Sequence, residues 1–387
     1  MSRLRYLTAG ESHGEALTIL LEGLPANLPL DLERVDAWLA QRQMGHGRGG
    51  RQKIEQDRVR VTAGLRNGLT LGSPLVMTID NRDWANWERV MHATHVEARY
   101  LKSAAIHRPR PGHADLPGGL KYDQQDLRNI LERASARETA ARTAAGAVAA
   151  ELLACFGARV AGHVVEIGGV ASKGPVSFSQ ACAAASSPVR CADARAGKAM
   201  VAAIDKAKAA GDSLGGAFEV RLTGLPPGLG SHVQWDRKLD ARMARALMSI
   251  QAIKAVEVGL GAGFAHLPGS KVHDPIRYRK GRYLHESNNA GGFEGGMSNG
   301  EEVVLRATMK PIPTLFKPLM TVDMQTKQRI KARYERSDTC AVPAACVVGQ
   351  AVACFEAADA FLEKFGGDSM AEVKRNHKAA LAAMARR

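Results

Sequence analysis

Short runs of apolar residues alternate along the chain with stretches of helical periodicity. The first apolar run covers 17–21 and ends in Gly23-Leu24-Pro25, which predicts a strand closed by a turn. The next stretch predicts a helix over 31–43, with Asp31 as its N-cap because that carboxylate can accept hydrogen bonds from the first free backbone amides. The pattern therefore favours a protein that mixes strands and helices.

The pattern of the first half returns in the second half. Residues 9–29 align with 210–230 without a gap, and ten of the twenty-one positions are identical. An Asn-Gly turn signal precedes the last predicted strand of each half. The matching predictions are helix 31–43 and strands 59–64 and 75–79 in the first half, and strand 218–222, helix 234–248 and strands 255–259 and 303–307 in the second.

Each half closes with a long alanine-rich helix, predicted over 126–156 and 343–365. Gly146 and Gly349 fall at matching offsets on small-residue faces, which would let the two helices approach closely. We therefore expect an α+β fold, a layered β-α-β sandwich with an internal pseudo-two-fold repeat and central helices between antiparallel sheets. The expected layout is a single domain over 1–387, with repeats at about 3–156 and 205–365, a connector at 157–204, a strand near 160–170, a helix near 195–210 and a basic C-terminal helix at 368–387.

The composition is that of an ordinary soluble chain, with 45% hydrophobic and 24% charged residues among 387. No run approaches the eighteen or so apolar residues that span a bilayer, and no apolar leader follows Met1, so a cytoplasmic protein is expected. The six cysteines include no Cys-x-x-Cys pair. Reduced, buried thiols are therefore expected rather than a zinc site or a disulfide framework.

The formal net charge of +14 indicates anionic partners, which could be nucleic acid, a membrane surface or small polyanions. Aromatic residues make up only 5% of the chain, so stacking platforms for single-stranded nucleic acid are scarce. Clamps for the phosphate and carboxylate groups of a small substrate fit best, because arginine presents a planar fork to such groups. The arginines in loops rich in glycine or small residues are Arg42, Arg48, Arg51, Arg108, Arg110, Arg133, Arg137 and Arg336.

The segment 107–122 is the first candidate for chemistry. It places two histidines, His107 and His113, among three prolines and three glycines. Rigid proline steps and glycines that allow close backbone approach are typical of a functional loop rather than a plain connection. We interpret the segment as the wall of an anion-binding site, with Arg110 as an anion clamp and His107 as loop structure.

Residues that differ between the two halves are the next candidates, because a duplicated framework keeps in both copies what folding requires. His13 stands opposite Leu214 although its flanking glycines and serine recur, and histidine is the natural proton donor or acceptor near neutral pH. Asp338 stands opposite Ser135. Two interpretations of Asp338 stay open, a catalytic carboxylate and a helix N-cap.

Two further segments have both a structural and a functional interpretation. Lys310-Pro311-Ile312-Pro313-Thr314 is either the exit of an edge strand or a holder for a phosphate or a ring edge. The glycine-rich stretch 287–296, within an insertion at about 263–295, is either a cofactor loop or a mobile linker. The chain has neither a Walker A pattern nor a strand-GxGxxG-helix unit, which disfavours a nucleotide in either standard site.

Three long motifs resemble the signatures of the chorismate synthase family. They are Gly10-Glu11-Ser12-His13-Gly14, Arg133-Ala134-Ser135-Ala136-Arg137-Glu138-Thr139 and Arg336-Ser337-Asp338-Thr339-Cys340-Ala341-Val342-Pro343. The resemblance implies a lyase that converts 5-enolpyruvylshikimate 3-phosphate into chorismate and phosphate. It also implies reduced FMN as cofactor, without net redox change, and NADPH as a candidate reductant.

The resemblance also assigns residue roles. His13 would protonate the reduced flavin, His113 would assist phosphate departure as a proton donor, and Asp338, with Ser12, would assist proton abstraction. Ala134 stands where a serine is expected and Thr339 where proline is frequent. The implied FMN contacts are Arg133, Ala134, Ser135, Gln251, Ala252, Gly295, Lys310, Pro311, Ile312, Pro313, Thr314 and Arg336; Arg42 and Arg48 match positions for NADP or substrate anions, and Arg48, Arg51, Arg110 and Arg137 are the implied substrate contacts.

The implied assembly is a homotetramer that acts on a small molecule, with an external flavin reductase as a candidate partner and no nucleic-acid or membrane partner. Two other functions stay open on the residues alone. One is an FMN-dependent NADPH reductase, and the other is a basic nucleic-acid-binding protein, for which salt-sensitive oligonucleotide binding is expected.

Overall fold

The computed structural model describes residues 4–49, 56–279, 281–333 and 337–386. Its first sheet has the strand order β1-β2-β6-β3, with all pairs antiparallel. In β2 every second residue is buried, so Leu17, Ile19 and Leu21 face the core. The strands predicted in the first half are confirmed. They are β2 (Ala16–Glu22), β3 (Arg60–Ala63) and β6 (Leu75–Asp80), whereas β1 (Arg5–Ala9) was not predicted. The small hairpin β4 (Leu65–Arg66) and β5 (Leu69–Thr70) flanks the predicted Asn67-Gly68 turn.

The second sheet has the order β10-β15-β9-β7-β8 and is also antiparallel. The strand predicted in the connector is part of this sheet, because β7 pairs with β9 along most of its length. The neighbours β7-β9-β15-β10 follow the same order in the chain as β1-β2-β6-β3. The bounds are β7 (Arg159–Ile167), β8 (Val170–Ala171), β9 (Gly216–Thr223), β10 (Ile253–Val258) and β15 (Val303–Met309).

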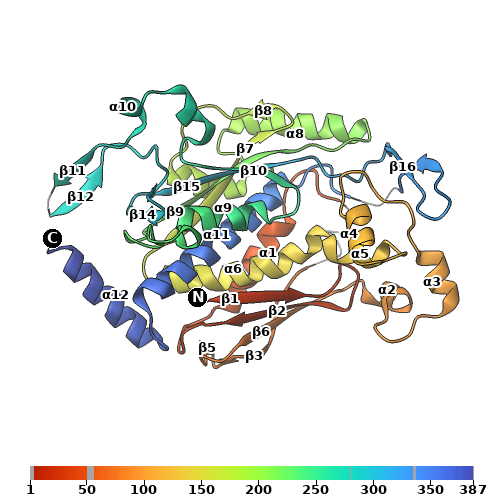
Figure 1. Cartoon of the computed structure of the whole chain (residues 1–387), viewed down its shortest axis with the longest axis horizontal. Helices are drawn as coiled ribbons and strands as arrows, with labels where there is room; N and C mark the ends of the chain where they lie inside the picture. Colours follow the sequence, from red (N-terminus) through yellow and green to blue (C-terminus); the bar gives the residue numbers. More distant parts are fainter. Residues whose placement is uncertain (1–3, 50–55, 280, 334–336, 387) are drawn as a thin grey trace.

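Helices from both halves of the chain lie between the two sheets in Figure 1, where the first sheet is at the bottom of the view. They are α1 (Leu32–Gln43), α6 (Thr139–Ala154), α9 (Leu239–Met248) and α11 (Val342–Phe365). At the α6–α11 crossing, a Cβ added to Gly146 would lie 2.2 Å from the carbonyl oxygen of Ala351. Helix α11 is long and apolar enough to cross a membrane by composition, but 94% of that stretch is buried inside the fold, so it is a core helix.

The helix predicted over 126–156 is interrupted, which corrects the sequence prediction. It consists of α5 (Arg128–Ala134), the 3-10 turn η2 (Ala136–Glu138) and α6. Ser135 has an extended backbone, with φ −60° and ψ 142°, and its side chain accepts a hydrogen bond from the backbone N–H of Arg137. A serine that caps in this way competes with the helical hydrogen bonds, which periodicity does not reveal.

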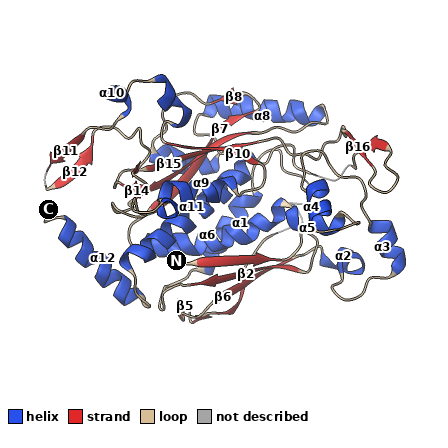
Figure 2. Cartoon of the chain, in the orientation of Figure 1, coloured by secondary structure: helices blue, strands red, loops and turns tan. Residues whose placement is uncertain are grey.

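The segment 107–122 is less irregular than expected, because its second part is the short helix α4 (Asp115–Lys121). Pro117 is compatible with this helix because it lies in the first turn, where a backbone N–H has no partner within the helix. Two helices that precede the segment, α2 (Trp84–Met91) and α3 (Ala98–Ala104), were not predicted. Figure 2 shows α2 to α5 gathered at one end of the molecule.

The remaining elements surround this core. The helix predicted over 234–248 is preceded by η4 (Trp235–Arg237) and begins only at Leu239, whereas the helices predicted near 195–210 and in 368–387 are confirmed as α8 and α12. Their bounds are α7 (Phe178–Ala183), η3 (Ala184–Ser186), α8 (Ala194–Ala209), η5 (Gly261–His266), α10 (Gly269–Val272), β11 (Ile276–Arg279), β12 (Arg282–His285), β13 (Phe293–Glu294), β14 (Met297–Ser298), β16 (Met320–Val322), β17 (Arg329–Lys331) and α12 (Met370–Met384).

The cysteines are all unpaired thiols, but not all are buried. Cys155 and Cys182 are exposed, which corrects the expectation of six buried thiols. Both lie at or near helix ends on the surface, where small-residue patterning gives no sign of exposure. Burial raises the pKa of Cys354 in α11 to about 12, so that thiol is inert in the core.

Candidate active site

His13 lies in the turn between β1 and β2 and is held by a buried carboxylate. Its Nδ1 lies 2.8 Å from Oε2 and 3.0 Å from Oε1 of Glu132, and its backbone N–H donates to the same carboxylate at 2.9 Å. The ring of Trp87 lies against the imidazole, with 3.8 Å between centroids. The turn needs Gly10, because its φ is +102° and a Cβ would lie 2.3 Å from the Ala16 carbonyl oxygen.

Glu132 is an ionised anchor at the base of this site. Its side chain has 0% exposure, and Oε1 also accepts from Nη1 of Arg128 at 3.1 Å. Burial alone would raise the pKa of Glu132, but the hydrogen bonds and charge of His13, with the charge of Arg128, lower it below its ordinary value. The carboxylate therefore stays charged near neutral pH and fixes the orientation of the imidazole.

His113 is held in a similar way, in the loop before α4. Its Nδ1 lies 2.5 Å from Oδ1 of Asp115, and Asp115 also accepts from Nε of Arg110 at 2.9 Å and from Nη2 at 3.1 Å. Asp115 is 1% exposed. Burial alone would raise its pKa, but the hydrogen bonds of His113 and Arg110 and their charges lower it strongly. Asp115 thus holds the imidazole of His113 and the guanidinium of Arg110 side by side in this loop.

The loop that carries His113 docks against the second half of the chain. Nζ of Lys310 donates to the carbonyl oxygen of Gly112 at 2.6 Å, and Nη1 of Arg110 donates to Oγ1 of Thr314 at 3.2 Å. Thr321 donates to the carbonyl oxygen of Pro109 at 2.7 Å. The sequence-predicted segments 107–115 and 310–314 are therefore brought together although about 200 residues separate them.

A second set of contacts joins the motif at 133–139 to the turn at 251–252. Arg133 donates to the carbonyl oxygens of Gly10 at 3.0 Å and Thr8 at 2.7 Å. Glu138 accepts from Thr8 Oγ1 at 2.8 Å and from Gln251 Nε2 at 3.2 Å. Ala252, the residue after Gln251, has a left-handed backbone conformation.

That residue, Ala252, has a φ of +69°, a conformation in which alanine is rare. Its carbonyl oxygen accepts from the backbone N–H of Lys310 at 2.9 Å. Strained backbone of this kind clusters at functional sites. Contacts therefore run from Arg133 through Gln251 and Ala252 to Lys310 and the His113 loop.

Asp338 lies in the segment before α11 and does not cap that helix. Its Oδ1 accepts from the backbone N–H of Gly49 at 2.6 Å, and its Oδ2 lies 2.5 Å from Nη1 of Arg48. The N-cap position of α11 is Ala341, which makes no side-chain capping bond. The N-cap interpretation is therefore wrong, and the carboxylate instead faces the loop that follows α1.

Three candidates from the sequence are buried inside the fold. Arg42 donates to Thr139 Oγ1 at 2.9 Å and lies 3.5 Å from Asp57, while Arg137 donates to both oxygens of Asp57 at 2.6 Å. Ser12 is 3% exposed, and its backbone N–H donates to the carbonyl oxygen of Glu132 at 2.9 Å. Both arginines therefore have internal partners, so part of their role is to hold the junction of α1 with η2 and α6.

Not every candidate joins these contacts. Gly295 lies in the turn between β13 and β14, where a Cβ would be 3.8 Å from His232 Cβ and 3.9 Å from Met297 Cε. Ala134 ends α5 and Ser135 follows it, next to Arg133. Arg51 and Arg336 lie outside the described residues.

Sequence reasoning missed the acids that stand behind these candidates. Glu132 and Asp115 hold the two histidines, Asp57 holds Arg137, and Glu138 accepts from Gln251. The spacing of Arg128 and Glu132 at i and i+4 was one available signal, because such residues share a helix face. Asp115 is also close in sequence to His113 and Arg110, so its pairing could have been suspected from the loop itself. The pairings of Glu132 with His13 and of Asp57 with Arg137 join residues far apart in the chain and leave no local pattern.

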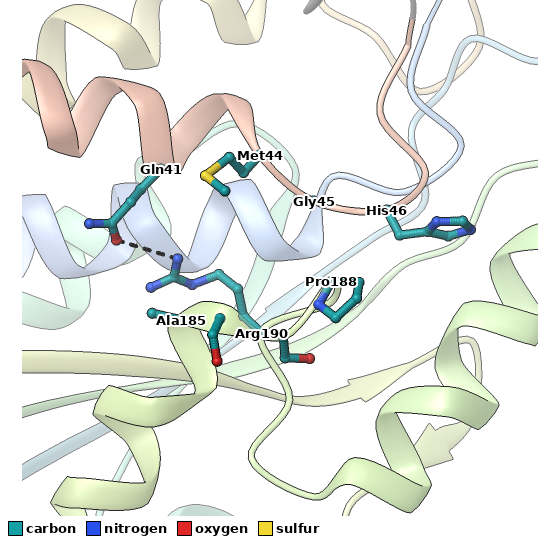
Figure 3. Close-up of a pocket in the computed structure, with 9 residues that line it drawn as sticks. Gln41, Met44, Gly45, His46, Ala185, Pro188 and Arg190 are labelled. Atoms are coloured by element: carbon teal, nitrogen blue, oxygen red, sulfur yellow. Dashed lines mark hydrogen bonds between the residues drawn. The ribbon is translucent and has the colours of Figure 1, made fainter.

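Two pockets among the described residues lie elsewhere. One of about 360 Å³ lies between the end of α1 and the segment 185–190, and Figure 3 shows its walls. Another of about 260 Å³ lies beside the hairpin β11–β12 and includes Tyr283 and Met297. Neither contains His13, His113 or Asp338. We rank the histidine network above both as the catalytic site, because it gathers acids, bases and cations.

The comparisons with known proteins point to one family. The family model described as chorismate synthase matches residues 4–362. A chorismate synthase of Moorella thermoacetica is 60% identical over 366 residues, which is 94% of this chain and 95% of that protein. A chorismate synthase of Pelobacter propionicus is 58% identical over 386 residues, or 97% and 98% of the two chains. A crystal structure of a chorismate synthase superposes with a TM-score of 0.81 at 42% identity and covers 100% of both chains.

Proposed function

The chain belongs to the chorismate synthase family, and on this premise we propose that the residues around His13, His113, Lys310 and Asp338 form its active site. The protein is a lyase of aromatic amino-acid biosynthesis. It converts 5-enolpyruvylshikimate 3-phosphate into chorismate and phosphate by a 1,4-elimination with no net redox change. The family match over residues 4–362 carries this conclusion.

Reduced FMN is the cofactor that we propose for this site, because the residues present suit it. Oε1 of Gln251 is buried and has no hydrogen-bond donor among the described residues. The backbone N–H of Lys310 donates to the carbonyl oxygen of the neighbouring Ala252, and its Nζ adds a cation at the His113 loop. A reduced flavin supplies an electron-rich ring when it is bound. The proposed contacts are Arg133, Ala134, Ser135, Gln251, Ala252, Gly295, Lys310, Pro311, Ile312, Pro313, Thr314 and Arg336, with Arg42 and Arg48 as candidates for NADPH.

His13 is the proposed proton donor on one side of the site. Its Nδ1 is held by Glu132, so Nε2 is the nitrogen that is directed away from the anchor and exchanges the proton. The ionised carboxylate stabilises a positive imidazole in a setting where water is largely excluded. The stacked ring of Trp87 limits rotation of the imidazole plane.

His113 is the proposed acid for the departing phosphate. Asp115 holds its Nδ1, which leaves Nε2 for the substrate, and the guanidinium of Arg110 lies within 3.4 Å of that nitrogen. Arg110 and Lys310 place fixed positive charge on the same loop. Preorganised cations stabilise the charge that develops on a leaving phosphate, so this loop lowers the barrier to C–O cleavage.

Asp338 is the proposed base for the ring hydrogen, assisted by Ser12. The backbone N–H of Gly49 and the guanidinium of Arg48 hold its carboxylate in one orientation. The substrate carries a phosphate and two carboxylates, and these charges need cationic partners to leave water. The proposed substrate cations are Arg48, Arg51, Arg110 and Arg137.

The reaction itself is tested by anaerobic incubation of the protein with chemically reduced FMN and 5-enolpyruvylshikimate 3-phosphate. Stoichiometric phosphate and the absorbance of chorismate are expected. If neither appears, the proposed function is wrong. Oxidation of NADPH without phosphate release would favour a flavin reductase, and salt-sensitive oligonucleotide binding would favour a nucleic-acid-binding protein.

The roles of the histidines are tested by His13→Ala and His113→Ala. Each is expected to lower kcat about 100-fold or more while FMN still binds, because a positioned acid contributes at least that factor. His107→Ala is the matched control, since His107 lies on the same loop and its ring Nδ1 lies 3.2 Å from the backbone carbonyl oxygen of Gln125, outside the proposed site. Turnover near the wild-type rate in either active-site variant would remove that assignment.

We further propose a cytoplasmic homotetramer that receives reduced flavin from an external reductase. The chain is also proposed to consist of two copies of one unit, at about 3–156 and 205–365, related by a pseudo-two-fold axis. The matching strand orders of the two sheets support the repeat. Sedimentation of the purified protein at several concentrations measures the assembly.

A further inference from the structure

Arg190 is a buried cation without a counter-ion. The residue is 6% exposed, and it forms no ion pair with any described carboxylate. Its side chain donates one hydrogen bond to Oε1 of Gln41, at 3.4 Å, and its Nε is buried without a partner among the described residues. A buried charge is costly unless it is paired, so this position calls for an anion that the described residues do not supply.

The other buried arginines each have a carboxylate partner or several acceptors, which sets Arg190 apart. Arg42 and Arg137 pair with Asp57, and Arg128 pairs with Glu132. Arg142 lacks a carboxylate, but it donates to Tyr6, to Ser249 at two atoms and to Ala246. Arg190 has neither a carboxylate partner nor such a set of oxygen acceptors among the described residues.

The thiol of Cys346 does not compensate the charge. It contacts the guanidinium, but burial raises its pKa to about 11 although Arg190 opposes the rise. The thiol is therefore neutral at pH 7. Backbone strain adds to the cost of this position, because Arg190 has a left-handed φ of +56°.

The guanidinium borders a pocket of about 360 Å³. In Figure 3 it lies below Gln41, with Met44 and Ala185 on either side and Pro188 further along the wall. Met44, Ala185 and Pro188 make much of the wall apolar, and His46 at the rim is already bound to Asp205 at 2.6 Å. A single cation among apolar walls matches a single negative charge on an apolar body.

We propose that this pocket binds a small organic carboxylate, whose carboxylate pairs with Arg190 and whose apolar part lies against Met44 and Pro188. Inorganic phosphate fits less well, because it would leave the apolar walls uncovered. The site is separate from the proposed active site, but the two are joined through one segment. Residues 44–46 line the pocket, and Gly47 and Gly49 bind Thr339 and Asp338.

Calorimetric titration of the whole protein with benzoate tests the proposal, with acetate and inorganic phosphate as comparison ligands at equal ionic strength. We expect benzoate to bind the wild type at least about tenfold more tightly than either comparison ligand. Arg190→Met is expected to abolish benzoate binding and to raise or preserve the thermal midpoint without ligand, because it removes an unpaired buried charge. Its turnover of 5-enolpyruvylshikimate 3-phosphate reports that the variant is folded.

Arg195→Met is the matched control, since this exposed arginine lies nearby at the start of α8. It is expected to bind benzoate as the wild type does. The proposal is overturned if Arg190→Met binds benzoate as tightly as the wild type, or if the wild type fails to bind it. Equal affinity for benzoate and acetate would overturn the claim for an apolar body.

Discussion

Each candidate catalytic histidine is backed by a buried carboxylate that an arginine also holds. His13 rests on Glu132, and His113 rests on Asp115. In both pairs the carboxylate contacts Nδ1, so the proposed chemistry falls to Nε2. A carboxylate that orients an imidazole selects one tautomer, as in other His–acid arrangements. The acids are therefore positioning residues for the proposed reaction.

Glu132→Gln tests this positioning at the residue scale. The amide keeps the shape of the side chain but removes its charge, so the protonated imidazole of His13 is less stabilised. We expect kcat to fall about 10- to 100-fold with FMN binding retained, and the basic limb of the kcat profile to move to lower pH. Stopped-flow measurement of chorismate formation between pH 6 and pH 9 gives both quantities.

Glu88→Gln is the control for this prediction, because Glu88 is exposed on α2 beside Trp87. It is expected to leave both kcat and its pH profile unchanged. If Glu132→Gln lowers stability but leaves the pH profile in place, Glu132 has only a structural role.

At the scale of elements, the crossing of α6 and α11 sets the distance between the layers. Gly146 lets the helix backbones touch, since an added Cβ would lie 2.2 Å from the Ala351 carbonyl oxygen. Gly349, at the matching offset, instead faces Phe218 of β9, with 2.6 Å between an added Cβ and the ring. The two glycines thus meet different neighbours, a helix backbone in one half and a sheet in the other.

Gly146→Ala is expected to destabilise the protein. Alanine is the better helix former by about 1 kcal/mol, so helix propensity alone would stabilise α6. The clash with backbone cannot be relieved by a side-chain rotation, and we expect a net loss of about 1–3 kcal/mol in the free energy of unfolding. Urea denaturation measures the change in the free energy of unfolding. A loss shows that the backbone clash outweighs the gain in helix propensity, and a gain shows the opposite.

Gly263→Ala is the matched control for this crossing. Its nearest neighbour for an added Cβ is Leu260 Cβ at 3.7 Å, which is ordinary contact. A change within about 0.5 kcal/mol is expected there. Equal effects at the two glycines would contradict the steric explanation.

The break between α5 and α6 is the other decisive feature at this scale. It turns the chain at Ser135, so that α5 carries Glu132 and Arg133 to the β1–β2 turn while α6 stays in the core. In a continuous helix, residues 128–134 would extend along the same axis as α6, and Glu132 and Arg133 would not reach the β1–β2 turn. The proposed site therefore exists because one serine caps η2 instead of extending the helix.

At the scale of the whole molecule, buried carboxylates make the fold depend on pH. Glu219, on β9, pairs with His163, Arg221 and Arg306 from three strands of the second sheet. Burial alone would raise the pKa of Glu219, but the hydrogen bonds of His163 and Arg306 and the nearby charges lower it from 4.5 to about 2. Its folded form therefore holds the proton less tightly than the unfolded chain.

The stability that Glu219 contributes is present above about pH 4.5 and is lost as the pH falls towards 2. Glu219→Gln is expected to remove about 2 kcal/mol of the difference in unfolding free energy between pH 7 and pH 3. Urea denaturation at both pH values measures this difference, with Glu88→Gln as the exposed control. An unchanged difference would mean that Glu219 does not drive acid unfolding.

The sequence by itself determined the local elements and the family. Apolar alternation located the strands around 17–21, 75–79 and 303–307, and the small-residue run located α11, because these patterns depend on neighbours a few residues apart. Its three long motifs resembled one family, and the comparisons with known proteins agree. The candidate histidines also came from sequence, since His13 and Leu214 differ between otherwise similar halves.

Only the tertiary structure decided which groups face one another. Glu132 became the partner of His13, and Arg190 was left without a carboxylate partner among the described residues, because these outcomes depend on packing among elements distant in the chain. The alanine pattern over 126–156 continued past Ser135, whereas the side-chain cap there ended the helix. Periodicity reports which face of an element is buried, but the charge that a buried residue meets is set by the fold.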